Sequence, residues 1–301
     1  MRVGTRASPL ALAQAELVAE VLGDCEIVPI VTSGDRGVAG EDKSRWVHEL
    51  EDALMSGTID LAVHSAKDVP GELAEGLSLL GAPARAAAED VLCGADGLDE
   101  LALGARVGTS SVRRAAQLLS AREDLEIVTL HGNVDTRLRK LADPGGAGLQ
   151  AIVLARAGLQ RLQRESDLGA VLDPERFVPA PGQGVLALEG RSDDSRVRKA
   201  LAAITDASAF ACLLAERALA RALGASCQTP LGAHAAHTDG GRLRMRAWLG
   251  LPDGSAWASD ELVGDASEPE ALGRKVAERL RLAGAGELLR RAEEMAAVGN
   301  A

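Results

Sequence analysis

Short β-rich segments alternate with helical segments through the first 190 residues of this 301-residue chain. EIVPIVT (26–32) comes before a helical segment that begins at Trp46, and IDLAVHS (59–65) follows it. In that helical segment, apolar residues fall at i, i+4, i+7 and i+8, which places them on one face of a helix. Gly57 can end this helix. This alternation predicts βαβ units around mostly parallel sheets.

The segments between residues 105 and 155 repeat this alternation. They open with Val107-Gly108-Thr109, as the chain itself opens with Val3-Gly4-Thr5, and an Ala-Gln pair follows in both blocks. Two similar α/β domains that face each other would form a cleft, the usual place for a small ligand. We therefore expect an α/β protein with a ligand between its first two domains.

From residue 205 the pattern changes to a long helical segment and then to the loop GASCQTPLGAHA, which carries Cys227. Two strand-like segments (242–250 and 255–264) are separated by a Pro-Asp-Gly turn, and a helical pattern ends the chain. This indicates a third, α+β domain. The predicted boundaries are 1–84 with 183–203, 88–179, and 205–301.

Composition narrows the possible partners. A net charge of −11 argues against a partner held by phosphate neutralisation, and 2% aromatic residues leave few platforms for stacked bases, so we expect no nucleic acid. We find no signal peptide and no long apolar segment, which predicts a cytoplasmic protein without a membrane partner. A monomer is the default expectation.

The four cysteines form no CxxC pair, and the histidines form no HExxH motif, so the sequence predicts neither a disulfide nor a metal site. Cys25, Cys93 and Cys212 lie in or beside apolar segments and are expected to be buried. Cys227 differs because its loop consists of small residues that would leave the thiol accessible.

Ligands of open parallel sheets bind beyond the carboxyl ends of the strands. At the first such end, TRASP places Arg6 beside a helix that Ser8 can cap. At the third, HSAKDVP brings together Ser65, Lys67 and Asp68. A Lys-Asp pair there is either a solvated turn or an acid/base site tuned by nearby charge.

The second domain carries hydroxyls and arginines at the corresponding positions. Two arginines in the first turn of a helix oppose its dipole, and a bound anion would compensate for this. Several arginine–carboxylate contacts of about 1.5–3 kcal/mol each would hold a small molecule with several carboxylates. The glycine spacing supports neither a dinucleotide fingerprint nor a P-loop. The hydroxyls and arginines at these positions of the second domain are Thr109, Ser110, Ser111, Arg113 and Arg114. Further along, Asn133 is a possible helix cap and Arg137 follows one turn later.

Six segments, in order between residues 5 and 235, resemble the hydroxymethylbilane synthase (porphobilinogen deaminase) family. They are TRASPLALAQA, LAVHSAKDVP, VGTSSVRR, GNVDTRL, PAPGQGVLALE and GASCQTPLGAHA. The resemblance implies two periplasmic-binding-protein-like α/β domains around a cleft, plus a small C-terminal α+β domain.

The resemblance also implies roles for single residues. Cys227 matches the attachment residue, whose sulfur forms a thioether to a dipyrromethane cofactor, and Asp68 matches the catalytic aspartate. The cofactor would be held by Ser65, Lys67, Thr109, Ser110, Ser111, Arg113, Arg114 and Arg137, and the substrate by Arg6, Ser8 and Gln183, the last of which would also lie at a hinge.

The implied reaction begins with porphobilinogen, which loses ammonia to give an azafulvenium cation that the growing chain attacks. Four rounds precede hydrolytic release of 1-hydroxymethylbilane. The sequence departs from the family pattern at His131, where arginine is usual, and a neutral histidine offers a single donor. It also departs at Trp46–Leu50 and in a shortened loop that contains Lys43.

Two alternatives stay open from the residues alone. A receptor for organic anions would use the same arginines but would leave Cys227 and Asp68 without a role. A thiol-dependent hydrolase would need His234 or His237 to activate Cys227.

Overall fold

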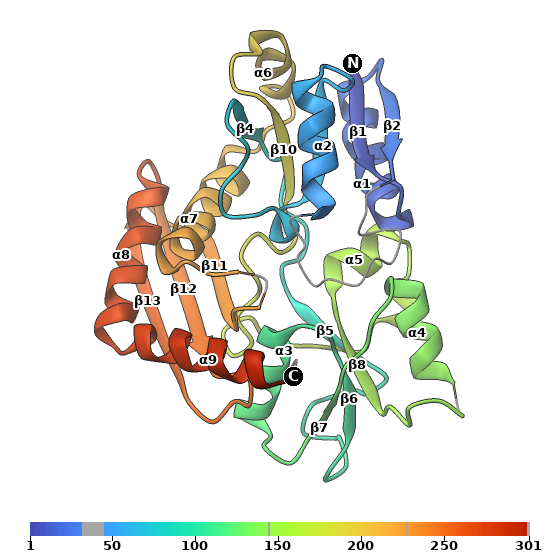
Figure 1. Cartoon of the computed structure of the whole chain (residues 1–301), viewed down its shortest axis with the longest axis vertical. Helices are drawn as coiled ribbons and strands as arrows, with labels where there is room; N and C mark the ends of the chain where they lie inside the picture. Colours follow the sequence, from blue (N-terminus) through green and yellow to red (C-terminus); the bar gives the residue numbers. More distant parts are fainter. Residues whose placement is uncertain (32–44, 144, 227, 300–301) are drawn as a thin grey trace.

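The computed structural model describes residues 1–31, 45–143, 145–226 and 228–299, and the strands within these ranges form three sheets (Figure 1). The first sheet has the order β2-β1-β3-β10-β4, in which β1 is parallel to β2 and β3 while β10 is antiparallel to both of its neighbours. Its strands are β1 (Arg2–Arg6), β2 (Glu26–Ile30), β3 (Leu61–Ser65), β4 (Leu77–Gly81) and β10 (Leu186–Arg191).

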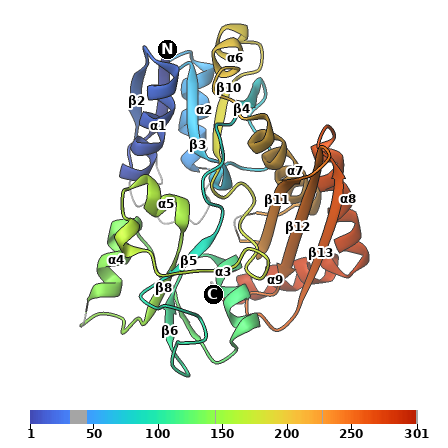
Figure 2. The same cartoon turned by 180° about the vertical axis from the view of Figure 1, so that it is seen from behind.

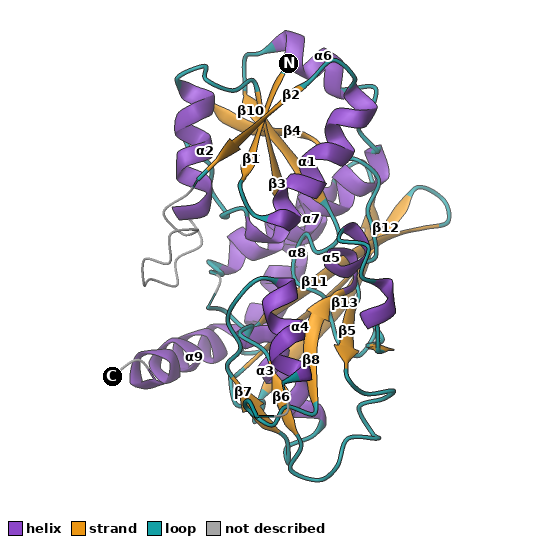
Figure 3. Cartoon of the chain, turned by 90° about the vertical axis from the view of Figure 1, so that its right-hand side faces the viewer, coloured by secondary structure: helices purple, strands orange, loops and turns teal. Residues whose placement is uncertain are grey.

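Helices cover both faces of this sheet, as Figure 3 shows. On β3, Val63 packs with α1 (Pro9–Leu22) and α6 (Ser195–Leu201), whereas its neighbour Ala62 packs with α2 (Arg45–Met55) on the opposite face. This follows from the alternation of side chains along a strand. The predicted end of α2 is confirmed, since Gly57 has a φ of 70° and its N–H bonds the carbonyl of Leu54.

The second sheet repeats the plan with the order β7-β6-β8-β5-β9, and β5 is its antiparallel strand. The two Val-Gly pairs noted in the sequence lie on β1 and β6, the corresponding strands of the two sheets. The prediction of two similar α/β domains is therefore confirmed. The elements are β5 (Asp90–Cys93), β6 (Arg106–Gly108), α3 (Val112–Ala121), β7 (Glu126–Val128), α4 (Val134–Ala142), β8 (Ala151–Ala155), α5 (Arg156–Arg161) and β9 (Ala170–Val171).

The third sheet is an antiparallel meander, β11-β12-β13, with a core shared by its helices, and it confirms the C-terminal α+β domain (Figure 2). We did not predict β11, because its sequence LGAHAAHT is poor in β-branched and aromatic residues. Pairing with β12 along its whole length forms it instead. The elements are α7 (Ala207–Leu223), β11 (Leu231–Thr238), β12 (Arg242–Gly250), β13 (Trp257–Asp265), α8 (Pro269–Leu282) and α9 (Ala285–Gly299).

Two segments connect the first two sheets, one from β4 to β5 and one from β9 to β10. A single carboxylate, that of Glu216 on α7, ties both to the third domain. It accepts hydrogen bonds from the guanidinium of Arg85 at 2.6 Å, the N–H of Gly182 at 2.6 Å and the N–H of Ala235 on β11 at 2.7 Å. The domain boundaries given above remain a prediction.

Among the cysteines, Cys93 and Cys212 are buried as expected, but Cys25 is only half-buried. Within the described ranges, no helix has both the length and the apolar character needed to cross a bilayer.

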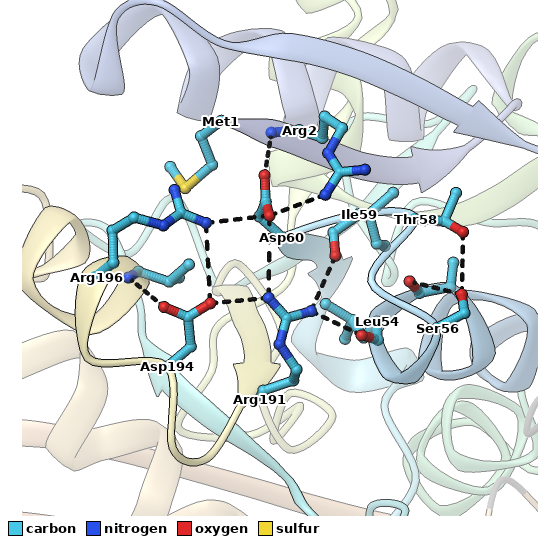
Figure 4. Close-up of polar contacts among 12 residues, drawn as sticks. Met1, Arg2, Leu54, Ser56, Thr58, Ile59, Asp60, Arg191, Asp194 and Arg196 are labelled. Carbon is cyan, nitrogen blue, oxygen red and sulfur yellow. Dashed lines mark hydrogen bonds and ion pairs between the residues drawn. The ribbon is translucent and has the colours of Figure 1, made fainter.

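A polar network connects the end of β10 and the helix α6 with the start of β1 and with Asp60, the residue before β3 (Figure 4). Asp60 accepts hydrogen bonds from the backbone N–H of Arg2 at 2.8 Å, from its guanidinium at 3.2 Å, and from Arg196 on α6 at 3.1 Å. Arg191, at the end of β10, bonds Asp194 at 2.8 Å. Through Asp60 the network fastens α6 to the start of β1 and to the residue before β3, and through Arg191 it links β10 to the N-cap of α6.

We expect Asp60→Asn to lower the free energy of unfolding at neutral pH by about 1–3 kcal/mol, because a charged acceptor for two arginines is lost. Burial of Asp60 opposes ionisation, but hydrogen bonds from Arg2 and the charges of Arg2 and Arg196 lower its pKa. A lowered pKa stabilises the fold above the unfolded-state value of about 4, and this contribution is lost as the pH falls through the folded-state value. Denaturant titrations of both proteins from neutral to acid pH should therefore converge. The exposed Asp193→Asn is the control, and an equal effect of both substitutions would contradict the prediction.

Candidate active site

The first strand end of the first domain has the predicted cap. Arg6 is the last residue of β1, and α1 begins because the hydroxyl of Ser8 accepts the N–H of Ala11 at 3.4 Å, with Pro9 in the first turn. Proline suits this position because the first helical N–H has no partner within the helix. Arg6 and Ser8 thus lie at the carboxyl edge of the first sheet.

The third strand end continues into a short 3-10 helix, η1 (Ala66–Asp68). Ser65 exchanges hydrogen bonds with the side chain of Gln14 on α1, at 2.9 and 3.1 Å. Ala66 and Val69 are buried, whereas Lys67 and Asp68 between them are only partly so. The apolar residues anchor η1 and leave Lys67 and Asp68 partly exposed.

Hydroxyl and amide side chains open the helices of the second domain as predicted. Ser111 accepts the N–H of Arg114 at 3.4 Å at the start of α3, and Thr109 accepts the N–H of Ser111 at 3.1 Å. Asn133 caps α4 through the N–H of Thr136 at 2.9 Å.

Asp90, which the sequence analysis overlooked, is the internal partner of the two arginines in the first turn of α3. Its carboxylate, 1% exposed, accepts hydrogen bonds from Arg113 at 2.8 Å, Arg114 at 2.7 Å and Gln183 at 2.9 Å. Burial alone would raise the pKa of Asp90, but the two guanidinium groups and Gln183 hold it well below its usual range. A protein carboxylate therefore supplies part of the compensating anion that we expected. The signal in the sequence was an aspartate at the head of the apolar strand DVLC.

Arg137 interacts with predicted site residues of both domains. Its guanidinium donates to the carbonyl of Gly132 at 2.8 Å and to the hydroxyl of Ser110 at 3.1 Å. Burial lowers its pKa, the charge of Arg114 lowers it further, and the carboxylate of Asp68 raises it. Asp68 comes from the first domain and Arg114 from the second, so charges from both domains act on Arg137.

The charges of this cluster do not cancel. Three guanidinium groups stand against two carboxylates: Arg113, Arg114 and Arg137 against Asp68 and Asp90. The buried Nε of Arg113 also makes no hydrogen bond within the described part of the chain. A surplus positive charge with a spare donor fits a group that carries carboxylates.

The remaining predicted residues are placed as follows. Gln183 is buried, and its amide also donates to the carbonyl of Ala88 at 2.6 Å, so it bridges the two connecting segments. His131 is exposed and lies just ahead of α4. Cys227 and Lys43 lie outside the described residues.

Arg161 is a residue that we did not predict. It ends α5, the helix that follows the carboxyl end of β8, and donates to the carbonyl of Gly184 at 2.7 Å. Burial lowers its pKa to about 10. The segment LARAGLQR after β8 carried the same strand-end signal as the other junctions, and we overlooked it.

Two α/β domains with a carboxylate and a cluster of arginines at the ends of their strands are typical of a protein that binds an anionic small molecule. The family model for "Porphobilinogen deaminase, dipyromethane cofactor binding domain" matches residues 1–199, and that for the "Porphobilinogen deaminase, C-terminal domain" matches residues 210–281. The chain belongs to the porphobilinogen deaminase family.

Curated relatives agree along the whole chain. The porphobilinogen deaminase of Thermus thermophilus is 43% identical over 95% of this chain and 97% of its own length. That of Stenotrophomonas maltophilia is 44% identical over 96% of this chain and 98% of its own length. The chain is thus a transferase of tetrapyrrole biosynthesis with a dipyrromethane cofactor. It deaminates porphobilinogen and condenses four molecules head to tail, and hydrolysis releases 1-hydroxymethylbilane.

We expect Asp90→Asn to destabilise the protein by about 3–5 kcal/mol, because it leaves two buried guanidinium groups without their counter-charge. The loss should persist at mildly acid pH, since the pKa of Asp90 is far below its usual range and the carboxylate stays ionised there. Denaturant titration at neutral pH and near pH 5 measures both effects. The exposed Asp99→Asn is the control, and a comparably small effect of Asp90→Asn would contradict a central role for this carboxylate.

Proposed function

We propose that Asp68 is the catalytic residue and that Cys227 carries the cofactor through a thioether. The charge interaction between Asp68 and Arg137 is the observation that supports this most directly, because it relates a carboxylate of the first domain to an arginine of the second. A substrate with acidic side chains and a cationic reacting centre needs both charges in one site.

Arginines and hydroxyls would hold the acidic side chains of the pyrrole units. A carboxylate accepts two parallel hydrogen bonds from one guanidinium, which fixes its orientation as well as its position. Asp90 already holds Arg113 and Arg114 in place, so less ordering remains when a ligand arrives. The cofactor would be held by Ser65, Lys67, Thr109, Ser110, Ser111, Arg113, Arg114 and Arg137, and the substrate by Arg6, Ser8 and Gln183.

Asp68 would act on the charge that develops when ammonia leaves porphobilinogen. A carboxylate beside the pyrrole stabilises the cationic ring and can accept or return its proton. When bound, the dipyrromethane supplies the free pyrrole α-carbon that accepts the first new unit.

Replacement of Asp68 by asparagine should leave the fold intact and lower kcat by about 10²–10⁴-fold, the usual contribution of a general acid/base. Ammonia release from porphobilinogen measures kcat, and circular dichroism checks the fold. Asp52→Asn, an exposed aspartate on α2, is the matched control. Full turnover by the Asp68 variant would refute the assignment.

Intact-mass analysis tests the attachment. We expect the purified protein to exceed its sequence mass by two linked pyrrole units, and peptide mapping should place them on Cys227. Cys227→Ser should lack the adduct, whereas Cys25→Ser, at a half-buried thiol of the first domain, should keep it. An adduct on any other residue would contradict the proposal.

The mass measurement and two histidine substitutions separate the alternatives. A protein that binds porphobilinogen without ever gaining mass would be a receptor for organic anions. A thiol hydrolase would instead depend on a histidine, and His234→Ala or His237→Ala would abolish its activity. We further propose that the enzyme works in the cytoplasm as a monomer, without a nucleic-acid partner.

A further inference from the structure

We propose that Arg217, on α7 of the third domain, is a positioning residue that sets the backbone immediately after Asp68. This inference rests on the proposed catalytic role of Asp68, but its structural half can be tested separately.

Arg217 holds three successive carbonyl groups of the first domain. Its guanidinium donates to the carbonyl of Val69 at 3.3 Å, to that of Pro70 at 2.8 Å and to that of Gly71 at 3.0 Å. The side chain is buried although it is charged. A planar fork of five donors can satisfy three carbonyls at once, which a lysine ammonium on a flexible stem does less well.

The same face of α7 also fixes the other side of η1. Leu213, one helical turn before Arg217, packs in a core cluster with Ala66 and Val69, the two apolar residues that flank Lys67 and Asp68. Residues four apart lie on one helix face, so α7 presents a leucine and an arginine side by side to η1. One element of the third domain thereby limits both the tilt and the position of η1.

Arg217 stays charged in spite of its burial. Burial lowers its pKa to about 10 and the charge of Arg221 adds to this, whereas Glu189 and Glu72 act in the opposite direction. At neutral pH the guanidinium therefore stays protonated, and its hydrogen bonds to the carbonyls are charge-assisted.

The helix also leads to the loop of Cys227. α7 ends at Leu223, and Gly224 closes it with a φ of 69°. Arg217 lies seven residues before this glycine, about 10 Å along the axis. A single helix thus contacts the segment that follows Asp68 and ends at Leu223, four residues before the proposed attachment cysteine in the sequence.

Two substitutions test the proposal in the full-length enzyme, each with a matched control at Arg221, one turn along α7 and ion-paired with Glu270. Arg217→Lys should lower kcat for porphobilinogen about 10- to 100-fold, as expected for a small misplacement of a catalytic group, with KM little changed. Arg217→Ala should lose more, and added ethylguanidinium should restore part of its kcat while ethylammonium should not. Arg221→Lys and Arg221→Ala should keep the wild-type kcat.

Hydrogen–deuterium exchange gives a readout that does not depend on activity. In Arg217→Lys, amides of residues 66–72 should exchange faster while those of the second domain are unchanged. Unchanged exchange in that segment, or a kcat within twofold of wild type, would overturn the proposal. If Asp68→Asn kept full turnover, the catalytic assignment would fail instead, and the exchange data would still decide whether Arg217 orders η1.

Discussion

The buried carboxylate of Glu216 is the constraint on which the arrangement of the three domains depends. An isolated charge with no exposed side-chain surface would be very costly, so its donors have to be in place whenever the protein is folded. Those donors come from Arg85, Gly182 and Ala235, on both connecting segments and on β11. Gly182 can approach because it has no side chain, since a Cβ there would lie 2.9 Å from that of Ala66 in η1. The carboxylate therefore fixes the domain junction within van der Waals reach of the segment that bears Asp68.

A second buried carboxylate, Asp90, holds two arginines of the proposed binding site. Two adjacent arginines in a first helical turn repel each other and oppose the helix dipole. Asp90 neutralises one of these charges and holds both guanidinium groups in place, which leaves one charge for a ligand. The site is thereby ordered before the ligand arrives, yet it remains electrostatically incomplete. That combination suits a polycarboxylate better than full internal neutralisation would.

Features that depend only on residues close together in the sequence could be predicted. The caps at Ser8 and Asn133 and the end of α2 at Gly57 are local, and so is the alternation that gave the two α/β domains. The bonding partners of Asp90 and Glu216 were not predictable, because they lie far away in the sequence. Asp90 bonds Arg113, Arg114 and Gln183, and Glu216 bonds Arg85, Gly182 and Ala235. Only the folded topology brings these partners together. β11 was not predicted for a related reason, because its pairing with β12 rather than its own residues makes it a strand.

Hydrogen bonds join the two connecting segments, β4 to β5 and β9 to β10, into a two-stranded ribbon. Arg85 donates to the carbonyl of Gln183 at 3.0 Å, the N–H of Ala86 bonds the carbonyl of Gly184 at 3.1 Å, and Gln183 returns a bond to Ala88 at 2.6 Å. Each segment continues into the antiparallel strand of a sheet, β5 in one direction and β10 in the other. A rotation of one α/β domain against the other would have to twist both segments together, while Glu216 holds the ribbon at its middle. Such a rotation would change the distance between Asp68 and Arg137, which belong to different α/β domains, but would leave Asp90 with its two arginines because all three belong to the second domain.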